Sequence, residues 1–261
     1  MDLGLKDRTV LITAASRGLG RACALILAGE GMKVALAARD GKVLEALATE
    51  LRAAGGEALV LPSDLSDTAA PAALVEATVD HFGGLDALVV STPGPPSMPC
   101  VDVTDTEFRD AMEMNCLVPI RLTSAALPVM RAAGGGRIVY IGTIGVRMAQ
   151  REMVLSNASR LALLGYAKTL ALEVAADNVL VNMVAPGPLA TERMDELARQ
   201  TADRLGIDEH QAMDAWVGEV PLGRIGRAQD LASMVALLVS DACSYTTGAV
   251  LPIDGGKATA Y

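Results

Sequence analysis

Two glycines and an arginine follow the first apolar run of the chain, in segment 13–20, which reads Thr-Ala-Ala-Ser-Arg-Gly-Leu-Gly. Glycine lets a backbone approach a ligand closely, and the alanine-rich stretch after it predicts a helix from about residue 18. A helix N-terminus offers free N–H groups and a positive dipole end, which suits a pyrophosphate. A tight turn that binds nothing is the alternative. The residues of this loop predicted to bind the cofactor are Thr13, Ser16, Arg17, Gly18, Leu19 and Gly20.

Arg39 and Asp40 stand at the end of the second apolar run, 33–38. At this point of a dinucleotide-binding unit, an acidic residue accepts hydrogen bonds from the ribose 2′-OH of NAD, whereas an arginine favours the 2′-phosphate of NADP. Arg39 comes first, and Arg17 offers a second guanidinium to the same phosphate. The two arginines therefore predict NADP(H) as the cofactor. Two solvated surface charges are the alternative.

Short β-branched runs alternate with alanine-rich stretches along the whole chain. The predicted strands are 9–13, 33–38, 58–61, 85–91, 137–142, 179–184 and 249–253. The predicted helices are about 18–30, 41–54, 69–82, 105–132, 154–176 and 228–240. Strands that are apolar throughout and separated by helices indicate a parallel sheet covered on both faces. We therefore predict an α/β fold, a Rossmann-like doubly wound sheet of seven parallel strands.

The sequence shows no linker, repeat or shift in composition that would divide it. Residues 1–261 are therefore predicted to form a single dinucleotide-binding domain. A polar helical insertion at 192–218 is expected to form a small lid over a substrate. The lid and the segment 93–101 would shape the substrate pocket, but neither carries a pattern that names a substrate.

The charge balance and the cysteine content limit the partners. With 31 acidic against 22 basic side chains, the formal net charge is −9, which argues against nucleic acid and anionic membrane surfaces. The four scattered cysteines and two histidines lack the spacing of metal ligands, so no metal is expected. The chain has no signal peptide and no apolar run of about 20 residues. These features predict a soluble cytoplasmic protein with a small-molecule substrate.

The motifs resemble those of the short-chain dehydrogenase/reductase family over essentially the whole chain, and its 3-oxoacyl reductases in particular. Segment 13–20 is similar to the family's TGxxxGxG loop, with Ala14 in place of the first glycine. The resemblance implies a catalytic role for Asn115, in the position of the family's helical asparagine. The further residues that it implies as cofactor-binding are Asp64 and Leu65 at the adenine, Gly94, and Pro186, Gly187 and Thr191 at the nicotinamide carboxamide.

The resemblance breaks at the other catalytic positions. The family has a serine after the fifth strand, a tyrosine about 13 residues later and a lysine four residues beyond. The same register places Thr143, Ser156 and Arg160 at these positions, and no tyrosine of the sequence precedes a lysine by four residues. Ser156 and Arg160 share one helix face, so both can point at one bound ligand.

This replacement has a definite chemical cost. An aliphatic hydroxyl is a far weaker acid than a phenol, and arginine stays charged and relays no proton. Losing one general acid typically costs about 10²–10⁴ in rate. Thr143 and Ser156 can still hydrogen-bond a carbonyl oxygen, and Arg160 can stabilise developing negative charge. Glu152 is a candidate for the missing acid, although exposed loop carboxylates are common.

Three functions remain open from the sequence. The first is an NADP(H)-dependent oxidoreductase that acts on a carbonyl or alcohol with an atypical active site. The others are a non-redox enzyme on the same scaffold, such as a lyase or isomerase, and a catalytically silent dinucleotide-binding protein. The resemblance also implies a homotetramer or homodimer, and the apolar helices 154–176 and 228–240 and the final strand offer the surface for it.

Overall fold

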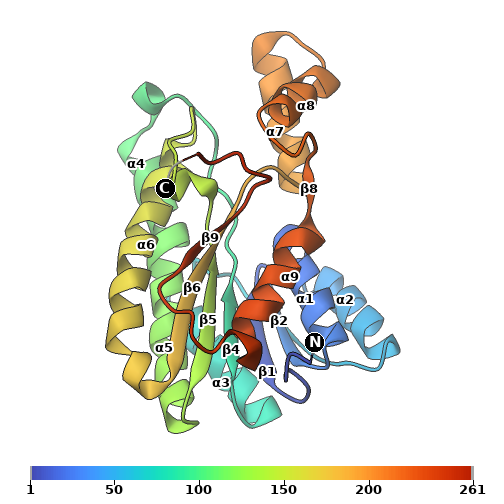
Figure 1. Cartoon of the computed structure of the whole chain (residues 1–261), viewed down its shortest axis with the longest axis vertical. Helices are drawn as coiled ribbons and strands as arrows, with labels where there is room; N and C mark the ends of the chain where they lie inside the picture. The colour runs from blue at the N-terminus through green and yellow to red at the C-terminus, as the bar shows by residue number, and fades with distance from the viewer. Residues whose placement is uncertain (1, 260–261) are drawn as a thin grey trace.

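The computed structural model describes residues 2–259, which contain a seven-stranded parallel sheet with helices on both faces (Figure 1). The sheet order is β3-β2-β1-β4-β5-β6-β9. Its strands are β1 (Thr9–Thr13), β2 (Lys33–Ala38), β3 (Glu57–Pro62), β4 (Ala87–Val90), β5 (Gly136–Ile141), β6 (Val179–Pro186) and β9 (Val250–Ile253). The order reverses between β1 and β4, where doubly wound sheets bind their ligands. The predicted Rossmann-like fold is confirmed.

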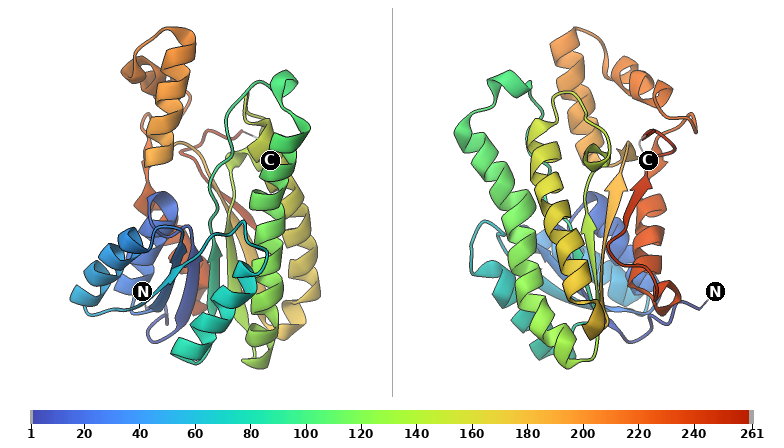
Figure 2. Two further views of the ribbon diagram at one scale, coloured as in Figure 1. Left: turned by 180° about the vertical axis from the view of Figure 1, so that it is seen from behind. Right: turned by 60° about the vertical axis from the view of Figure 1, so that its left-hand side comes forward.

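The helices form two layers, one on each face of the sheet (Figures 1 and 2). One layer contains α1 (Gly18–Gly29), α2 (Gly41–Ala53) and α9 (Ala228–Val239). The other contains α3 (Ala70–Phe82), α5 (Val118–Ala132) and α6 (Val154–Glu173). The strands read as continuous apolar runs because both of their faces are covered in this way.

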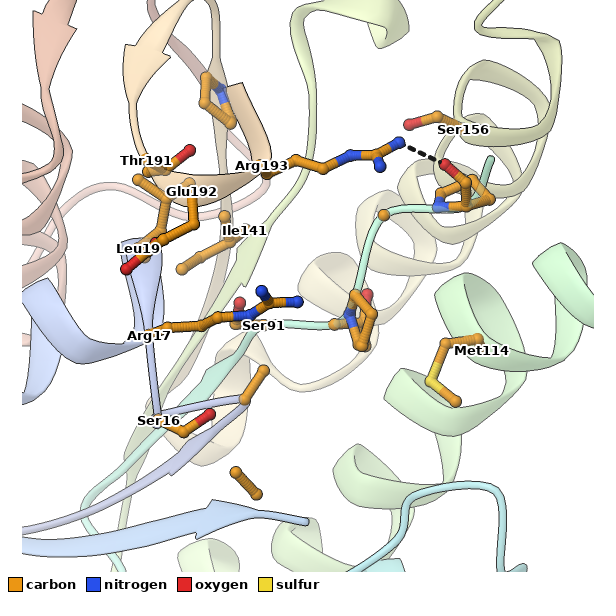
Figure 3. Close-up of a pocket in the computed structure, with 18 of the residues that line it drawn as sticks. Ser16, Arg17, Leu19, Ser91, Met114, Ile141, Ser156, Thr191, Glu192 and Arg193 are labelled. Carbon is orange, nitrogen blue, oxygen red and sulfur yellow. Dashed lines mark hydrogen bonds between the residues drawn. The ribbon is translucent and has the colours of Figure 1, made fainter. Parts of the chain in front are cut away.

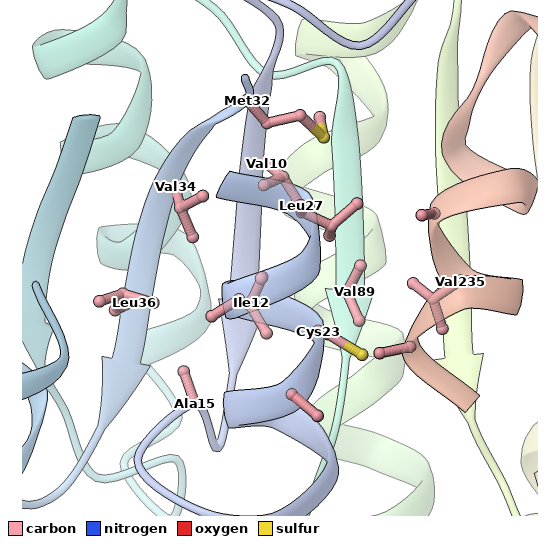
Figure 4. Close-up of a cluster of buried hydrophobic side chains, with 14 of the residues drawn as sticks. Val10, Ile12, Ala15, Cys23, Leu27, Met32, Val34, Leu36, Val89 and Val235 are labelled. Carbon is pink, nitrogen blue, oxygen red and sulfur yellow. The ribbon is translucent and has the colours of Figure 1, made fainter. Parts of the chain in front are cut away.

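An apolar core fills the space between the sheet and the layer of α1 and α9 (Figure 4). Cys23 and Leu27 of α1 lie between Ile12 and Val34 of the sheet and Val235 of α9, and all five side chains are fully buried. Burial disfavours the thiolate and raises the pKa of Cys23 to about 12. Cys23 is therefore an inert core residue, because only the thiolate is reactive.

The predicted continuous helix at 105–132 is wrong. The chain forms α4 (Asp105–Met112), then a π-helical turn (Glu113–Leu117), and then α5. The Val118 N–H bonds to the carbonyl of Glu113, five residues back, and Pro119 follows without an N–H to restore the α-helical pattern at once. The π-helical turn matters for the site because it contains Asn115.

The insertion predicted at 192–218 forms two helices that stand over the carboxyl ends of the strands (Figure 2). They are α7 (Glu192–Leu205) and α8 (Glu209–Gly218), and a short ladder of β7 (Leu189–Ala190) and β8 (Gly226–Arg227) closes their base. Gly206 ends α7 in the left-handed conformation, with φ of 64°. Within residues 2–259, no helix combines the length and apolar character that crossing a membrane requires.

Candidate active site

A cavity of about 700 Å³ opens at the carboxyl ends of the strands, beneath the lid (Figure 3). This volume lies in the range of small-molecule and cofactor sites. The predicted site residues that line it are Ser16, Arg17, Gly18, Leu19, Arg39, Asp64, Leu65, Gly94, Thr143, Ser156, Arg160, Pro186, Gly187 and Thr191. Thr13, Gly20 and Asn115 do not line the cavity. Segments far apart in the sequence thus meet around one space.

The glycine loop is held by groups that face away from the cavity. The Thr13 hydroxyl donates to the Ser91 carbonyl at 2.6 Å and accepts from the Ser91 N–H at 3.0 Å, which ties β1 to the loop after β4. A Cβ at Gly20 would lie 2.4 Å from the Ala14 carbonyl oxygen, so only glycine fits. Ala14 itself is left-handed, with φ of 48°, which costs an L-residue about 1–2 kcal/mol and explains the family's glycine there.

Asp40 is engaged as the N-cap of α2. Its Oδ1 accepts from the N–H groups of Lys42 at 3.0 Å and Val43 at 3.2 Å. The helix therefore uses this carboxylate oxygen to satisfy its own unpaired donors. Asp40, the acidic residue that follows Arg39, is thus already engaged in part by hydrogen bonds at the N-terminus of its own helix.

Charged groups line the rim of the cavity at the glycine loop. Hydrogen bonds from Ser66, together with the nearby positive charge of Arg39, hold the pKa of Asp64 below its usual range. Arg17 is well exposed and lies 3.3 Å from Glu196 of the lid, measured from Nη1 to Oε1. The guanidinium groups of Arg17 and Arg39 are therefore accessible to a ligand phosphate.

Two hydroxyl groups lie at the other end of the cavity. The Thr143 Oγ1 accepts from the Gly145 N–H at 3.2 Å, which leaves its own proton available to donate. Ser156 lies in the first turn of α6 and is 5% exposed. Among the residues that the structure describes, its hydroxyl has no hydrogen-bond partner. Both hydroxyls can therefore donate to an oxygen of a bound ligand.

Arg160 places a buried positive charge one helical turn after Ser156. Its Nη1 donates to the Ile141 carbonyl at 2.8 Å, and no carboxylate pairs with it in the described part of the chain. Burial lowers the pKa of Arg160 to about 10, so the side chain stays protonated at neutral pH. A guanidinium has five donors, of which this hydrogen bond uses one, and the residue lines the cavity.

Asn115 does not line the cavity but holds a residue that does. Its side chain is buried, accepts from the Thr92 hydroxyl at 2.9 Å and donates to the Ala111 carbonyl at 3.3 Å. Thr92 does line the cavity. Asn115 therefore holds the loop after β4 in place and is a positioning residue.

No tyrosine of residues 2–259 replaces the missing phenol. Tyr140 is fully buried on β5, hydrogen-bonded to the Thr123 hydroxyl at 2.6 Å, and burial raises its pKa. Tyr166 is partly buried on α6, and burial raises its pKa as well. Neither residue lines the cavity, and Tyr245 lies fully exposed elsewhere. Glu152 does not line it either, because its carboxylate pairs with Arg204 of the lid.

Several residues that line the cavity were not among the predicted site residues. Arg193 and Glu196 lie in the first turns of α7 and face the cavity together with Thr92, Met114 and Met153. The position of Arg193 two residues after Thr191 was a usable signal, because the chain enters the lid there. The direction in which the Arg193 side chain points depends on how the lid packs, and the spacing of residues in the sequence does not determine that packing.

Comparison with known proteins agrees with this geometry. The family model described as enoyl-(acyl carrier protein) reductase matches residues 13–258. The chain is 33% identical over 255 residues to the 3-oxoacyl-[acyl-carrier-protein] reductase FabG of Pseudomonas aeruginosa, covering 97% of this chain and 98% of that one. The chain belongs to the short-chain dehydrogenase/reductase family. It is thus a member of a family of oxidoreductases.

Solved structures of reductases superpose on all or nearly all of the chain. L-sorbose reductase from Gluconobacter frateurii, complexed with NADPH and L-sorbose, gives a TM-score of 0.94 at 28% identity, with 100% of both chains covered. Levodione reductase gives a TM-score of 0.93 at 30% identity, covering 98% of this chain and 99% of that one. The fold of this chain is therefore shared with these two reductases over essentially its whole length.

Proposed function

We propose that this protein is an NADP(H)-dependent oxidoreductase that acts on a carbonyl or an alcohol with a non-standard catalytic set. The observation that carries the proposal is one cavity lined both by a glycine loop with arginines and by Thr143, Ser156 and Arg160. The solved complex of L-sorbose reductase with NADPH supports the choice of cofactor.

The residues around the glycine loop fit a dinucleotide phosphate. Gly20 lets the loop close tightly, and α1 begins at Gly18 with its N–H groups toward the cavity wall. Arg17 and Arg39 suit a 2′-phosphate, for which guanidinium pairing is strong. Because Asp40 caps α2, its carboxylate is less available to accept hydrogen bonds from the ribose 2′-OH of NAD(H). This combination favours NADP(H) over NAD(H).

The catalytic end works without a phenolic acid. The nicotinamide cofactor, when bound, supplies or accepts the hydride. Ser156 stands at the position of the family's tyrosine and donates a hydrogen bond to the substrate oxygen, together with Thr143. Arg160, at the position of the family's lysine, stabilises negative charge on that oxygen. Asn115, in the π-helical turn, positions the loop that carries Thr92.

A catalytically silent dinucleotide-binding protein is the second candidate. It is favoured by one observation: no tyrosine of residues 2–259 lines the cavity, and Glu152 is paired with Arg204. A site with an intact cofactor frame and no proton donor would bind NADPH without turnover. A non-redox enzyme differs from both, because its turnover would need no nicotinamide.

Cofactor preference is tested by fluorescence titration with NADPH and NADH. We expect NADPH to bind more tightly, and Arg39→Ala to weaken NADPH binding about tenfold or more while NADH binding changes little. Arg109→Ala is the matched control, since Arg109 is an exposed arginine of α4 outside the cavity. Equal affinities for the two cofactors, or an unchanged NADPH affinity in Arg39→Ala, would refute the NADP(H) assignment.

Catalysis is tested with panels of carbonyls and alcohols in the presence of the cofactor. We expect measurable but slow turnover, because loss of a general acid typically costs about 10²–10⁴ in rate. Tight NADPH binding with no turnover over a broad panel would favour the silent binding protein. Turnover in the absence of any nicotinamide would favour the non-redox enzyme.

A further inference from the structure

Arg193 extends from the lid across the cavity toward Ser156 (Figure 3). Its Nη2 donates to the Pro95 carbonyl at 2.7 Å, which fixes the side chain over the cavity. Its Nη1 lies 3.4 Å from the Glu196 carboxylate. Since a guanidinium has five N–H donors, most of its hydrogen-bonding capacity is left for a ligand.

Glu196 does not neutralise this arginine. The same carboxylate is shared between Arg17 at 3.3 Å and Arg193 at 3.4 Å. Both distances exceed the 2.7–2.9 Å or so that is usual for charge-assisted bonds. One carboxylate shared at these distances leaves most donors of both guanidinium groups unused, and the other carboxylate of this side, Glu192, lies beside Gly18 of the glycine loop.

A second cation stands on the opposite wall. Arg160 is buried, and no carboxylate of the described residues pairs with it. A buried charge without a counterion is costly, and an anionic ligand would compensate it. Two methionines, Met114 and Met153, also line the cavity. Cationic and apolar groups are therefore available to a ligand that has a carbon skeleton and a negative charge.

Gly94 contributes to this arrangement. A Cβ at Gly94 would lie 3.4 Å from the Nε of Arg193, which is van der Waals distance, so the arginine packs directly above the loop. Together with the bond to Pro95, this contact aims the guanidinium rather than leaving it in solvent. The side chain is thus held in advance of binding, which reduces the entropy lost when a ligand binds.

We propose that the substrate is a carbonyl or hydroxy compound that carries a carboxylate, and that Arg193 is the residue that selects it. The inference rests on the proposed oxidoreductase function. The carboxylate accepts hydrogen bonds from the planar fork of Arg193, while the reacting oxygen faces Ser156. The buried charge of Arg160 favours the same anion.

The test compares oxo acids with their methyl esters, which keep the carbonyl and remove the charge. The pairs are pyruvate, acetoacetate and levulinate with their methyl esters, so that the spacing between carbonyl and carboxylate varies. We expect at least one acid to be preferred over its ester by about tenfold or more in kcat/KM. Arg193→Gln should abolish this preference, and Arg199→Gln, an exposed arginine on the same helix, should keep it.

If Arg193 only closes the lid and does not contact the substrate, the variant will give a different result. In that case Arg193→Gln would lower the values for acid and ester by the same factor, and the inference would be wrong. A preference of the wild type for the esters would overturn it as well. The ratio of acid to ester therefore separates charge recognition from a general role in closing the lid.

A binding measurement separates this inference from the proposed function. The same compounds are titrated by NMR against the protein with and without NADP⁺, which cannot reduce them. If no compound turns over but the acids bind in a manner that Arg193→Gln weakens about tenfold, the carboxylate site stands and the oxidoreductase function fails. If neither acid nor ester binds, or both bind equally, the carboxylate site is refuted.

Discussion

Ser156 and Arg160 share one face of α6 at the cavity wall. Restoring the family's residues with the double change Ser156→Tyr and Arg160→Lys is expected to raise carbonyl reductase activity about 10²-fold if proton transfer limits the rate. Ser156→Tyr alone should gain less, because without the adjacent ammonium the phenol keeps a higher pKa. The measurement is NADPH oxidation over the carbonyl panel.

Alanine variants provide the controls for this prediction. Ser156→Ala and Arg160→Ala should lower the native activity if these side chains polarise the substrate. Arg160→Ala also leaves the Ile141 carbonyl without its donor, so thermal unfolding must be recorded beside activity. A native reaction that is indifferent to both changes would show that this face of α6 carries no chemistry.

The sequence predicted which residue types face the cavity better than it predicted what each one does. The i and i+4 spacing correctly indicated that Ser156 and Arg160 line one space. It did not reveal that the Thr13 hydroxyl bonds to Ser91, or that Asn115 contacts the cavity wall through Thr92. These roles depend on contacts between segments about 20 to 80 residues apart, which local spacing does not determine.

At the level of elements, the strands were predictable because the inner ones are apolar runs buried on both faces, whereas the edge strands β3 and β9 are only partly buried. The break in the helix predicted at 105–132 was not, because a π-helical turn reflects a local balance of backbone bonds rather than a hydrophobic period. The lid was predicted as a helical insertion, but not as a helix joined to three other segments. α7 contacts the glycine loop through Glu196, the loop after β4 through Arg193, and the loop before α6 through Arg204.

The pair of Arg204 with Glu152 allows a test of how firmly the lid is held. Exposed ion pairs contribute up to about 1 kcal/mol, so Arg204→Ala should open the lid and raise its proteolysis by a factor of about five or less. Limited proteolysis with mass spectrometry of cuts in 192–218 measures this, and the melting temperature should change little. Arg199→Ala is the control on the same helix. Equal cleavage rates in both variants would contradict the role of the pair.

At the level of the whole molecule, the outer face of α6 carries two exposed leucines, with the exposed Lys168 between them. Leu172 is 82% exposed and Leu161 is 47% exposed, and the two lie three turns apart on one side of the helix. Gly165 lies between them, with open space where a Cβ would stand. The absence of a side chain at Gly165 allows a second helix to approach closely at this point. A two-fold axis that sets this face of α6 against the same face of a second copy would bury both leucines.

We therefore expect a homotetramer, or at least a homodimer, in analytical ultracentrifugation at micromolar concentration. The double variant Leu161→Glu and Leu172→Glu should shift the species to a smaller mass, because two charges on each copy would face their like across the axis. Val101→Glu provides the control, since Val101 is more exposed than either leucine but lies on the 3₁₀ turn at Cys100–Asp102. A monomeric wild type would refute the assembly, and an unchanged mass in the double variant would place the interface elsewhere, on α9 or β9.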